Sequence, residues 1–325
     1  MMLRNILQRF FGRETSCDAP KDARPADGFL LKLFPLRPDL PLPDGMSEAD
    51  AFAFLNSIRV EHGPEEEMAA YCRGDWKRFL YTWGLVRDLQ GPCLELGANP
   101  YFTTGLLREF TRLELTLANY FGPQFTAVPE QRMKMIRRGS SEPLWIPLPF
   151  HHFNIESERF PFPDHQFDVL LFCEIIEHLQ TDPLNVLREI KRVLKPGGTL
   201  VLTTPNVARL ENVARMMAGV NIYDQYSGYG AYGRHNREYN RHELHLLLSW
   251  AGFEVDAGFT ADVHPNQSLD YVSQGTMLSV AEELRRRQND LGQYIFLRAR
   301  SARPMKDKRP GWLYRSYPSG EIEAC

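Results

Sequence analysis

From residue 93 to about residue 300, short runs of apolar residues alternate with segments in which apolar residues recur at helical spacing. The runs predict strands near residues 93–96, 113–118, 152–155, 167–173, 199–203, 253–257 and 294–299. Strands that alternate with helices form a parallel sheet with helices on both faces. The pattern therefore predicts an α/β fold, with a doubly wound, seven-stranded, Rossmann-like sheet in residues 91–300.

The residues before this sheet have the pattern of helices. Ser47 and Asp50 have the spacing of a capping box, and Gly63 is placed to end the helix that they begin. A second set of apolar residues at helical spacing is typical of a buried helix face: Trp76, Phe79, Leu80, Trp83 and Val86. We therefore expect residues 29–90 to form an N-terminal helical cap.

The two ends of the chain differ from its middle. Residues 1–13 place apolar side chains on one helical face beside three arginines, and they contain no acid. Such a basic amphipathic helix either docks on its own domain or a partner, or rests on an anionic membrane surface. With the polar linker that follows, it makes up residues 1–28. Residues 301–325, rich in Lys, Arg and Pro, are expected to form a C-terminal tail.

Composition argues against several classes of protein. Lys and Arg total 38 against 41 Asp and Glu, so the formal net charge is -3 and no overall basic field exists to hold nucleic acid. The five cysteines contain no C-x-x-C pair, which argues against a disulfide framework or a zinc knuckle. No apolar stretch approaches the roughly 18 residues that cross a bilayer. We expect a cytoplasmic protein, with residues 1–13 as a candidate contact with the inner face of a membrane.

Three motifs lie around the predicted strands: LELGANP at residues 94–100, PFPDHQFDVLLFCEIIEHL at 161–179 and LREIKRVLKPGGTLVLTTPN at 187–206. Together they resemble the motif series of class I S-adenosylmethionine-dependent methyltransferases, and the resemblance covers about Trp76 to Arg300. It implies an enzyme whose cofactor is S-adenosylmethionine. A dehydrogenase is not favoured, because the loop GANPYF lacks the second and third glycines of G-x-G-x-x-G, which hold a pyrophosphate.

The resemblance implies that the cofactor lies against the strand ends and the loops after them, on nine residues: Glu95, Gly97, Ala98, Asn99, Asn119, Tyr120, Asn154, Ile155 and Cys173. Asn119 and Asn154 depart from the family pattern, which usually has acids at these places to meet the ribose hydroxyls and the adenine amino group. An amide binds hydroxyls without charge assistance. Three alternatives stay open for the ribose: weaker recognition, substitution by Glu114 or Glu130, or a shifted alignment.

The fourth predicted strand is followed by Glu174, Glu177 and His178. In a helical turn these side chains share one face, and two carboxylates with an imidazole are suited to Mg²⁺ or Mn²⁺. The E-x-x-E-H spacing resembles the metal-binding triad of ubiquinone-pathway O-methyltransferases and of small-RNA terminal-ribose methyltransferases. The latter add a later histidine, and His235 stands in a similar position. Without a metal, His178 or His235 is the better candidate general base, and Glu174 completes the candidate catalytic set, which helps to deprotonate the acceptor as ligands or as bases. In the alternative interpretation, the glutamate of this strand end lines the cofactor pocket and the histidine packs beside it.

A loop rich in glycine and tyrosine lies between the fifth predicted strand and the helix that Asn240 opens. Its tyrosines stand at every third position, and two arginines follow: Tyr223, Tyr226, Tyr229 and Tyr232, then Arg234 and Arg237. One interpretation makes this loop the acceptor site, with aromatic faces for a sugar, a base or another ring, and arginines for a phosphate. The other makes it a packed lid that does not contact the acceptor.

These observations predict a methyltransferase that modifies a hydroxyl of a small molecule or glycan, such as a sugar or a lipid-linked intermediate. A second hypothesis is 2′-O-methylation of RNA ribose, which needs a basic channel that the net charge does not favour. A third is a non-catalytic binding or scaffold module, in which the replaced acids leave a degenerate cofactor site. The sequence leaves these alternatives open.

Overall fold

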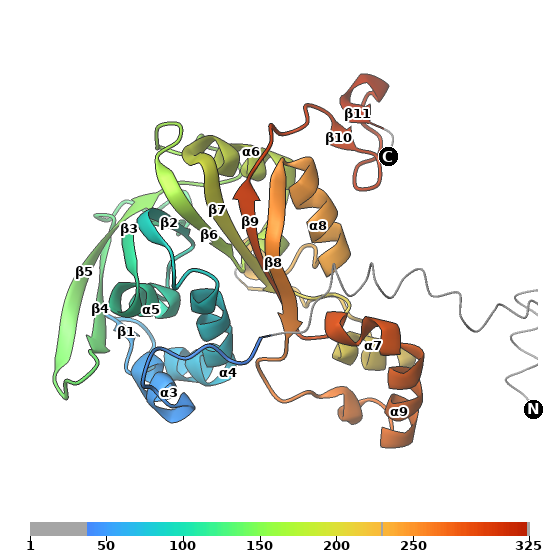
Figure 1. Ribbon diagram of the computed structural model, residues 1–325, viewed down its shortest axis with the longest axis horizontal. Helices are drawn as coiled ribbons and strands as arrows, with labels where there is room; N and C mark the ends of the chain where they lie inside the picture. Colours follow the sequence, from blue (N-terminus) through green and yellow to red (C-terminus); the bar gives the residue numbers. More distant parts are fainter. Residues whose placement is uncertain (1–37, 229, 324–325) are drawn as a thin grey trace, which may run out of the picture.

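The computed structural model describes residues 38–228 and 230–323, so the amphipathic segment 1–13 lies outside the described residues. One mixed sheet dominates the fold, and its strands are β1 (Arg59–Val60), β2 (Gln90–Leu96), β3 (Arg112–Asn119), β4 (Glu130–Ile136), β5 (Pro143–His152), β6 (Phe167–Cys173), β7 (Leu194–Pro205), β8 (Phe253–Ala261) and β9 (Tyr294–Ser301). Their order across the sheet is β1-β4-β5-β3-β2-β6-β7-β9-β8 (Figure 1).

The centre of the sheet is parallel. Strands β5, β3, β2, β6 and β7 run in one direction, and β9 is antiparallel to both β7 and β8. The chain passes from β2 to β3 and β5 on one side, and then returns to β6 and β7 on the other. Ligands of open parallel sheets bind at such a reversal, beyond the carboxyl ends of the strands. The predicted α/β class and doubly wound sheet are confirmed, with nine strands in place of seven.

The third predicted strand is wrong. The pattern placed it at residues 152–155, whereas β5 ends at His152 and forms an antiparallel hairpin with β4. Three prolines interrupt the apolar pattern of this strand: Pro143, Pro147 and Pro149. Successive N–H groups of a strand point to opposite edges, so the N–H of Phe150 points away from the edge that the three prolines face. Phe150 donates this N–H to the carbonyl of the residue before β4. The prolines therefore lack their N–H groups on the β3 side, where pairing is limited to residues 150–152.

Helices cover both faces of the sheet (Figure 1). One face carries α3 (Glu48–Asn56), α4 (Glu65–Gly84) and α5 (Phe102–Phe110), the other carries α6 (Pro183–Val193) and α8 (Arg241–Trp250), and α7 (Leu210–Met217) and α9 (Gln274–Glu283) follow β7 and β8. The predicted capping box of Ser47 and Asp50 is present. The helix ends at Asn56 rather than at Gly63, since the chain between them forms β1.

Two hydrophobic cores lie on opposite sides of the sheet. Successive residues of a strand face opposite sides, so Val169 and Leu171 of β6 join α4 in one core, while Leu170 and Phe172 join α6 and α8 in the other. The expected helical cap, from residue 38 onward, therefore packs directly on the sheet and forms one of its covering layers.

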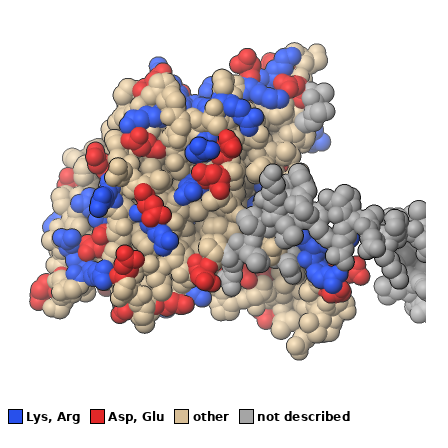
Figure 2. All heavy atoms as spheres, viewed as in Figure 1, with Lys and Arg blue, Asp and Glu red and all other residues tan. Residues whose placement is uncertain are grey.

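The C-terminal tail, with the short pair β10 (Arg309–Pro310) and β11 (Ile322–Glu323), packs beside α6. Arg309 Nε donates to Asp182 Oδ2 at 2.9 Å, and Asp182 also caps the start of α6. Elsewhere the surface is mixed: on the face shown in Figure 2, basic and acidic side chains are interspersed. Among the described residues, no helix combines the length and apolar character that crossing a membrane requires.

Candidate active site

Two cavities lie at the carboxyl end of the parallel strands, and both are lined by Leu96 and Gly97. The Asn119 cavity has a volume of about 180 Å³, and its other walls include Asn119, Tyr120, Asn154, Ile155, His178 and Tyr232. The Arg78 cavity has a volume of about 110 Å³, and its other walls include Arg78, Glu95, Ala98, Asn99, Cys173 and Glu174. All nine residues that the sequence resemblance implied for a cofactor line one cavity or the other.

Gly97 lines both cavities, and the packing around it leaves no room for a side chain. Its φ is +63°, in the region that favours glycine. A Cβ atom added here would lie 3.0 Å from Ile175 Cδ1, which is closer than ordinary contact. The end of β2 is therefore shaped by the absence of a side chain.

The Arg78 cavity contains a fixed cation between two carboxylates. Arg78 lies on α4, is buried, and donates from Nε to Asp75 Oδ1 at 2.9 Å and from Nη2 to the Tyr71 hydroxyl. Its Nη1 lies 3.5 Å from Glu174 Oε2. Burial opposes its charge, but Tyr71, Glu174 and Asp75 outweigh this and hold the pKa of Arg78 well above its usual value. A cation beside two anions is complementary to the zwitterionic end of an amino acid.

Glu95 lies in the wall of the Arg78 cavity without a charged partner. It is buried, and it accepts a hydrogen bond from Thr104 Oγ1 at 2.7 Å. Burial raises the pKa of Glu95 to about 8. At neutral pH this side chain is therefore a neutral acid in the ligand-free protein.

Aromatic rings form one wall of the Asn119 cavity. Tyr120 stacks on His152 with the ring centroids 5.2 Å apart, and it meets the edge of Tyr232 at 5.9 Å. Asn154 Nδ2 donates to the Tyr232 hydroxyl at 3.1 Å. The sequence analysis assigned Tyr232 to the binding site of the methyl acceptor. It instead lines the same cavity as Asn119 and Asn154, which the resemblance implied for the adenosine part of the cofactor.

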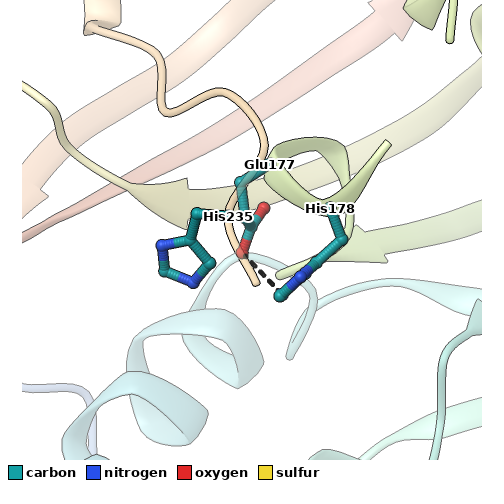
Figure 3. Close-up of side chains that lie close together, drawn as sticks. All are labelled: Glu177, His178 and His235. Atoms are coloured by element: carbon teal, nitrogen blue, oxygen red, sulfur yellow. Dashed lines mark ion pairs between the residues drawn. The ribbon is translucent and has the colours of Figure 1, made fainter. Parts of the chain in front are cut away.

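A cluster of titratable groups lies at the edge of the Asn119 cavity. The short 3-10 helix η1 (Ile176–His178) carries Glu177 and His178, and His235 comes from the segment before α8. The three candidate ligand atoms lie within 4.8 Å of one another, and Figure 3 shows the Glu177 carboxylate between the two imidazoles. Glu177 Oε2 accepts from Thr204 Oγ1 at 2.8 Å. Glu177 Oε1 is buried, lies 3.8 Å from His178 Nε2, and has no hydrogen-bond partner among the described residues.

Each imidazole of the cluster is held through its outer nitrogen. His178 Nδ1 lies 2.9 Å from the Arg234 carbonyl oxygen, and His235 Nδ1 lies 2.9 Å from Glu238 Oε1. Glu238 is itself paired with Arg209. Because a carbonyl oxygen only accepts, the neutral His178 ring carries its hydrogen on Nδ1 and presents a lone pair at Nε2. A carbonyl or carboxylate on the outer nitrogen is the usual arrangement of metal-ligating histidines.

The environment shifts the three pKa values in different directions. Burial, and then the charge of Glu174, raises the pKa of Glu177. Burial and the neighbouring His235 lower the pKa of His178. Burial also opposes the charge on His235, but Glu238 and Glu177 outweigh it and raise the pKa of His235. A buried carboxylate between two imidazoles can therefore hold either a proton or a cation.

Glu174 is separated from the cluster with which its spacing grouped it. It follows β6 with φ +54°, so the chain does not continue into the helical turn that would align Glu174 with Glu177 and His178. Its side chain accepts from Thr203 Oγ1 at 2.8 Å and faces Arg78. This corrects the expected set of four metal ligands to three, with Glu174 in the Arg78 cavity.

The described tyrosines of the loop do not share one surface, since Tyr232 lines the Asn119 cavity and the others do not. Tyr223 and Tyr226 are exposed, and Tyr229 lies outside the described residues. Arg234 lies over the Tyr226 ring, 4.9 Å from its centroid. Arg237 Nη2 lies 2.7 Å from Oε1 of Glu243, in the first turn of α8, so this ion pair holds the start of the helix.

Sequence patterns did not select several residues of the site. Arg78 is one of several charged residues of α4, so its place in the sequence does not indicate that this one is buried. Glu238 follows His235 by three residues, and Asn236 donates from Nδ2 to the His178 carbonyl at 2.8 Å. Gln131 lies on β4, which the pattern did not predict. Their roles depend on tertiary contacts.

Comparison with known proteins is consistent with these features. A family model described as a methyltransferase domain matches residues 110–202. The ubiquinone/menaquinone biosynthesis C-methyltransferase UbiE of Vibrio parahaemolyticus is 35% identical over 152 residues, which cover 47% of this chain and 53% of that protein. The chain contains a class I, S-adenosylmethionine-dependent methyltransferase domain. The malonyl-[acyl-carrier protein] O-methyltransferase of a Marinomonas species is 24% identical over 156 residues, covering 48% and 53%.

The sequence matches cover only part of each relative. The chain spans about half the length of the curated relatives that it matches. Among solved structures, a SAM-dependent methyltransferase from Archaeoglobus fulgidus aligns with a TM-score of 0.41 at 15% identity, over 71% of this chain and 93% of that chain.

The cavities of the methyltransferase domain suit S-adenosylmethionine. The methionine end of this cofactor carries a carboxylate and an ammonium, which match Arg78 and Glu174 in the walls of the Arg78 cavity. The adenosine end is flat and polar at its edges, which matches the tyrosine and asparagine walls of the Asn119 cavity. The crowded backbone at Gly97 lies where the two ends would meet.

Proposed function

We propose that the methyltransferase domain transfers the methyl group of S-adenosylmethionine to a hydroxyl oxygen of a small molecule or glycan. The observation that supports an oxygen acceptor is the unpartnered, buried Oε1 of Glu177 between His178 and His235. A hydroxyl is a poor nucleophile until its proton is removed, and this cluster offers a proton acceptor or a seat for a cation.

In the proposed complex, each end of the cofactor meets groups of complementary character. The methionine carboxylate would pair with Arg78, and Glu174, in the wall of the same cavity, would meet the ammonium. Adenosine lies in the Asn119 cavity, so the sulfonium lies near Gly97. Holding the acceptor oxygen about 3 Å from the methyl carbon, in line with the sulfur, contributes most of the rate.

The cluster also fits a divalent cation. Glu177 Oε1 lacks a partner among the described residues, and both imidazoles are bonded at their outer nitrogens, which leaves the inner nitrogens to coordinate. Two imidazoles and one carboxylate suit Mn²⁺ better than Mg²⁺, which prefers oxygen ligands. Glu177, His178 and His235 would hold the ion, and a bound ion lowers the pKa of a hydroxyl that it coordinates.

The same side chains can move a proton by themselves. Because burial and His235 lower the pKa of His178, its ring is neutral near pH 7, and Nε2 can accept a hydroxyl proton. Because burial raises the pKa of Glu177 to about 8, this neighbour stabilises the charged ring only after it has released its own proton. Glu238 holds His235 in place beside it.

The loop before His235 supports a sugar or a phosphate-bearing acceptor. Tyr226 is 93% exposed, and Arg234 lies against its ring. A tyrosine face stacks on a sugar ring, and an arginine binds the phosphate of a nucleotide-linked or lipid-linked molecule. RNA is less favoured, because the formal net charge of -3 provides no overall basic field to hold nucleic acid.

The proposal is tested by incubating the purified protein and cell extract with S-adenosylmethionine that carries an isotopically labelled methyl group. We expect mass spectrometry to find a labelled product whose methyl group is released by ether cleavage. A Glu177→Gln protein that still binds S-adenosylhomocysteine serves as the control and is expected to give no product. A label that stays bonded to carbon after ether cleavage would overturn the assignment of an oxygen acceptor.

A further inference from the structure

The loop after β2 is held in shape by side chains. Tyr101 takes a left-handed backbone conformation, with φ +71°, and its side chain is fully buried. A bulky residue rarely adopts this conformation, which persists where the surrounding contacts determine it. These contacts reach from the loop to the end of β3 and to β4.

Four hydrogen bonds join the loop to these two strands. The Asn99 N–H donates to Asn119 Oδ1 at 2.9 Å, and Asn119 Nδ2 donates to the Tyr101 hydroxyl at 3.0 Å. The Tyr101 hydroxyl donates to Gln131 Oε1 at 2.6 Å, and Asn99 Nδ2 donates to the same oxygen at 3.1 Å. We call these four side chains the amide network.

One backbone N–H determines the direction of every hydrogen bond in the amide network. The Asn99 N–H can only donate, so the atom of Asn119 that faces it is the oxygen, and the atom that faces Tyr101 is the nitrogen. The Tyr101 oxygen therefore accepts from Asn119 and sends its own hydrogen to Gln131. Gln131 must present its oxygen to both partners.

We propose that Gln131 is a positioning residue for S-adenosylmethionine, and that the amide network, in the direction in which its hydrogen bonds run, is matched to an amide at position 119. The proposal rests on the proposed function only in taking S-adenosylmethionine as the cofactor. In an Asn119→Asp protein, a carboxylate oxygen would face the Tyr101 oxygen, so the Tyr101 hydroxyl would have to turn its hydrogen from Gln131 to that carboxylate. The amides of Gln131 and Asn99 would then have to reverse, so that Gln131 Nε2 donates to both Tyr101 and Asn99.

The amide network explains the departure of Asn119 from the family pattern. Because its oxygen and nitrogen are each fixed by a partner, Asn119 presents a set orientation to the cavity that it lines. The added strand β4 supplies Gln131, which lines neither the Asn119 cavity nor the Arg78 cavity, so a strand beyond the predicted seven supports the cofactor loop from its other side.

The inference is tested by calorimetric titration of the full chain with S-adenosylhomocysteine. We expect Gln131→Leu to weaken binding about tenfold, because it leaves the Tyr101 hydroxyl and Asn99 Nδ2 without their acceptor. We expect Asn119→Asp to weaken binding about tenfold as well, because the whole network must reverse. Adding Tyr101→Phe to Asn119→Asp removes the hydroxyl through which the reversal reaches Gln131, and we expect it to restore most of the affinity. Lys134→Gln, on the opposite face of β4, is the matched control and should leave binding unchanged.

The test also separates this inference from the common family arrangement, in which an acid grips the ribose. If Asn119→Asp binds S-adenosylhomocysteine as tightly as the parent or more tightly, the inference is overturned. Thermal unfolding without ligand gives a second readout: Asn119→Asp should lower the Tm, and Tyr101→Phe should recover part of the loss. Failure of the parent chain to bind S-adenosylhomocysteine would instead overturn the proposed function, and this inference with it.

Discussion

The amide network after β2 and the cluster after β6 lie at the same edge of the sheet, yet they satisfy their polar atoms in opposite ways. In the network, the side chains of Asn99, Tyr101 and Gln131 bond to one another or to Asn119, and none of these groups is charged at neutral pH. In the cluster, Glu177 keeps a buried oxygen without a partner among the described residues, between two imidazoles.

This difference separates binding from chemistry. A closed network of neutral groups keeps its shape without help from a ligand, and it does not change with pH between 5 and 8. A buried, unpaired carboxylate oxygen costs free energy until a proton or a cation relieves it. The network is therefore suited to preorganise the cofactor site, and the cluster is suited to bind or release charge.

The largest expected effect tests whether the cluster holds a cation. We expect the parent chain to bind Mn²⁺ in a calorimetric titration, and Glu177→Gln to weaken this binding by about a hundredfold or more. Binding of S-adenosylhomocysteine should change less than about threefold, because the amide network and Arg78 do not depend on Glu177.

Two further variants sharpen this test. Glu174→Gln changes the neighbouring carboxylate, which the structure places beside Arg78; it should weaken Mn²⁺ binding much less than Glu177→Gln, because Glu174 acts on the cluster through its charge and not as a ligand. Glu238→Gln removes the charge behind His235 and should weaken Mn²⁺ about tenfold. No heat from Mn²⁺ with the parent chain, together with activity that survives chelation, would favour the proton over the cation.

The next effect concerns the charged end of the cofactor site. We expect Arg78→Lys to weaken S-adenosylhomocysteine about tenfold to a hundredfold, because a lysine cannot make the forked contacts of a guanidinium. The fragment 5′-methylthioadenosine has no amino acid end, so its affinity should stay within about threefold of the parent value. An equal loss for both ligands would show that Arg78 acts on the fold of the site and not on the methionine carboxylate.

The sequence predicted the parts of the fold that local pattern determines. Strand β6, FDVLLFC, is buried on both faces and reads as a continuous apolar run, and the capping box before α3 depends on neighbouring residues. Strands β4 and β5 escaped prediction because one reads EQRMKMI, with polar residues among its apolar positions, and the other contains three prolines. Their pairing is a tertiary event that a local pattern does not contain.

The candidate site could be predicted to a similar extent. Loops after parallel strands converge at one edge, so residues chosen at the strand ends do line the two cavities. Glu174 was grouped with the wrong neighbours because its direction depends on one backbone angle, φ +54°. Arg78 and Gln131 were missed because each reaches the site from an element that the strand pattern does not connect to it.

The smallest expected effect concerns Glu95, the carboxyl group in the wall of the Arg78 cavity that has no charged partner. Burial raises the pKa of Glu95 from 4.5 to about 8 in the folded chain. Between these values the unfolded chain releases the proton while the folded chain keeps it, so Glu95 lowers stability increasingly as the pH rises from about 4.5 to about 8.

A glutamine at this position does not titrate. We expect Glu95→Gln to raise the free energy of unfolding on the order of 1 kcal/mol at pH 7.5, and to have little effect at pH 4. Thermal unfolding of the ligand-free protein at both values measures this, with Glu114→Gln, exposed on β3, as the control. A gain that is equal at pH 4 and pH 7.5 would mean that packing, and not the buried proton, sets the cost of Glu95.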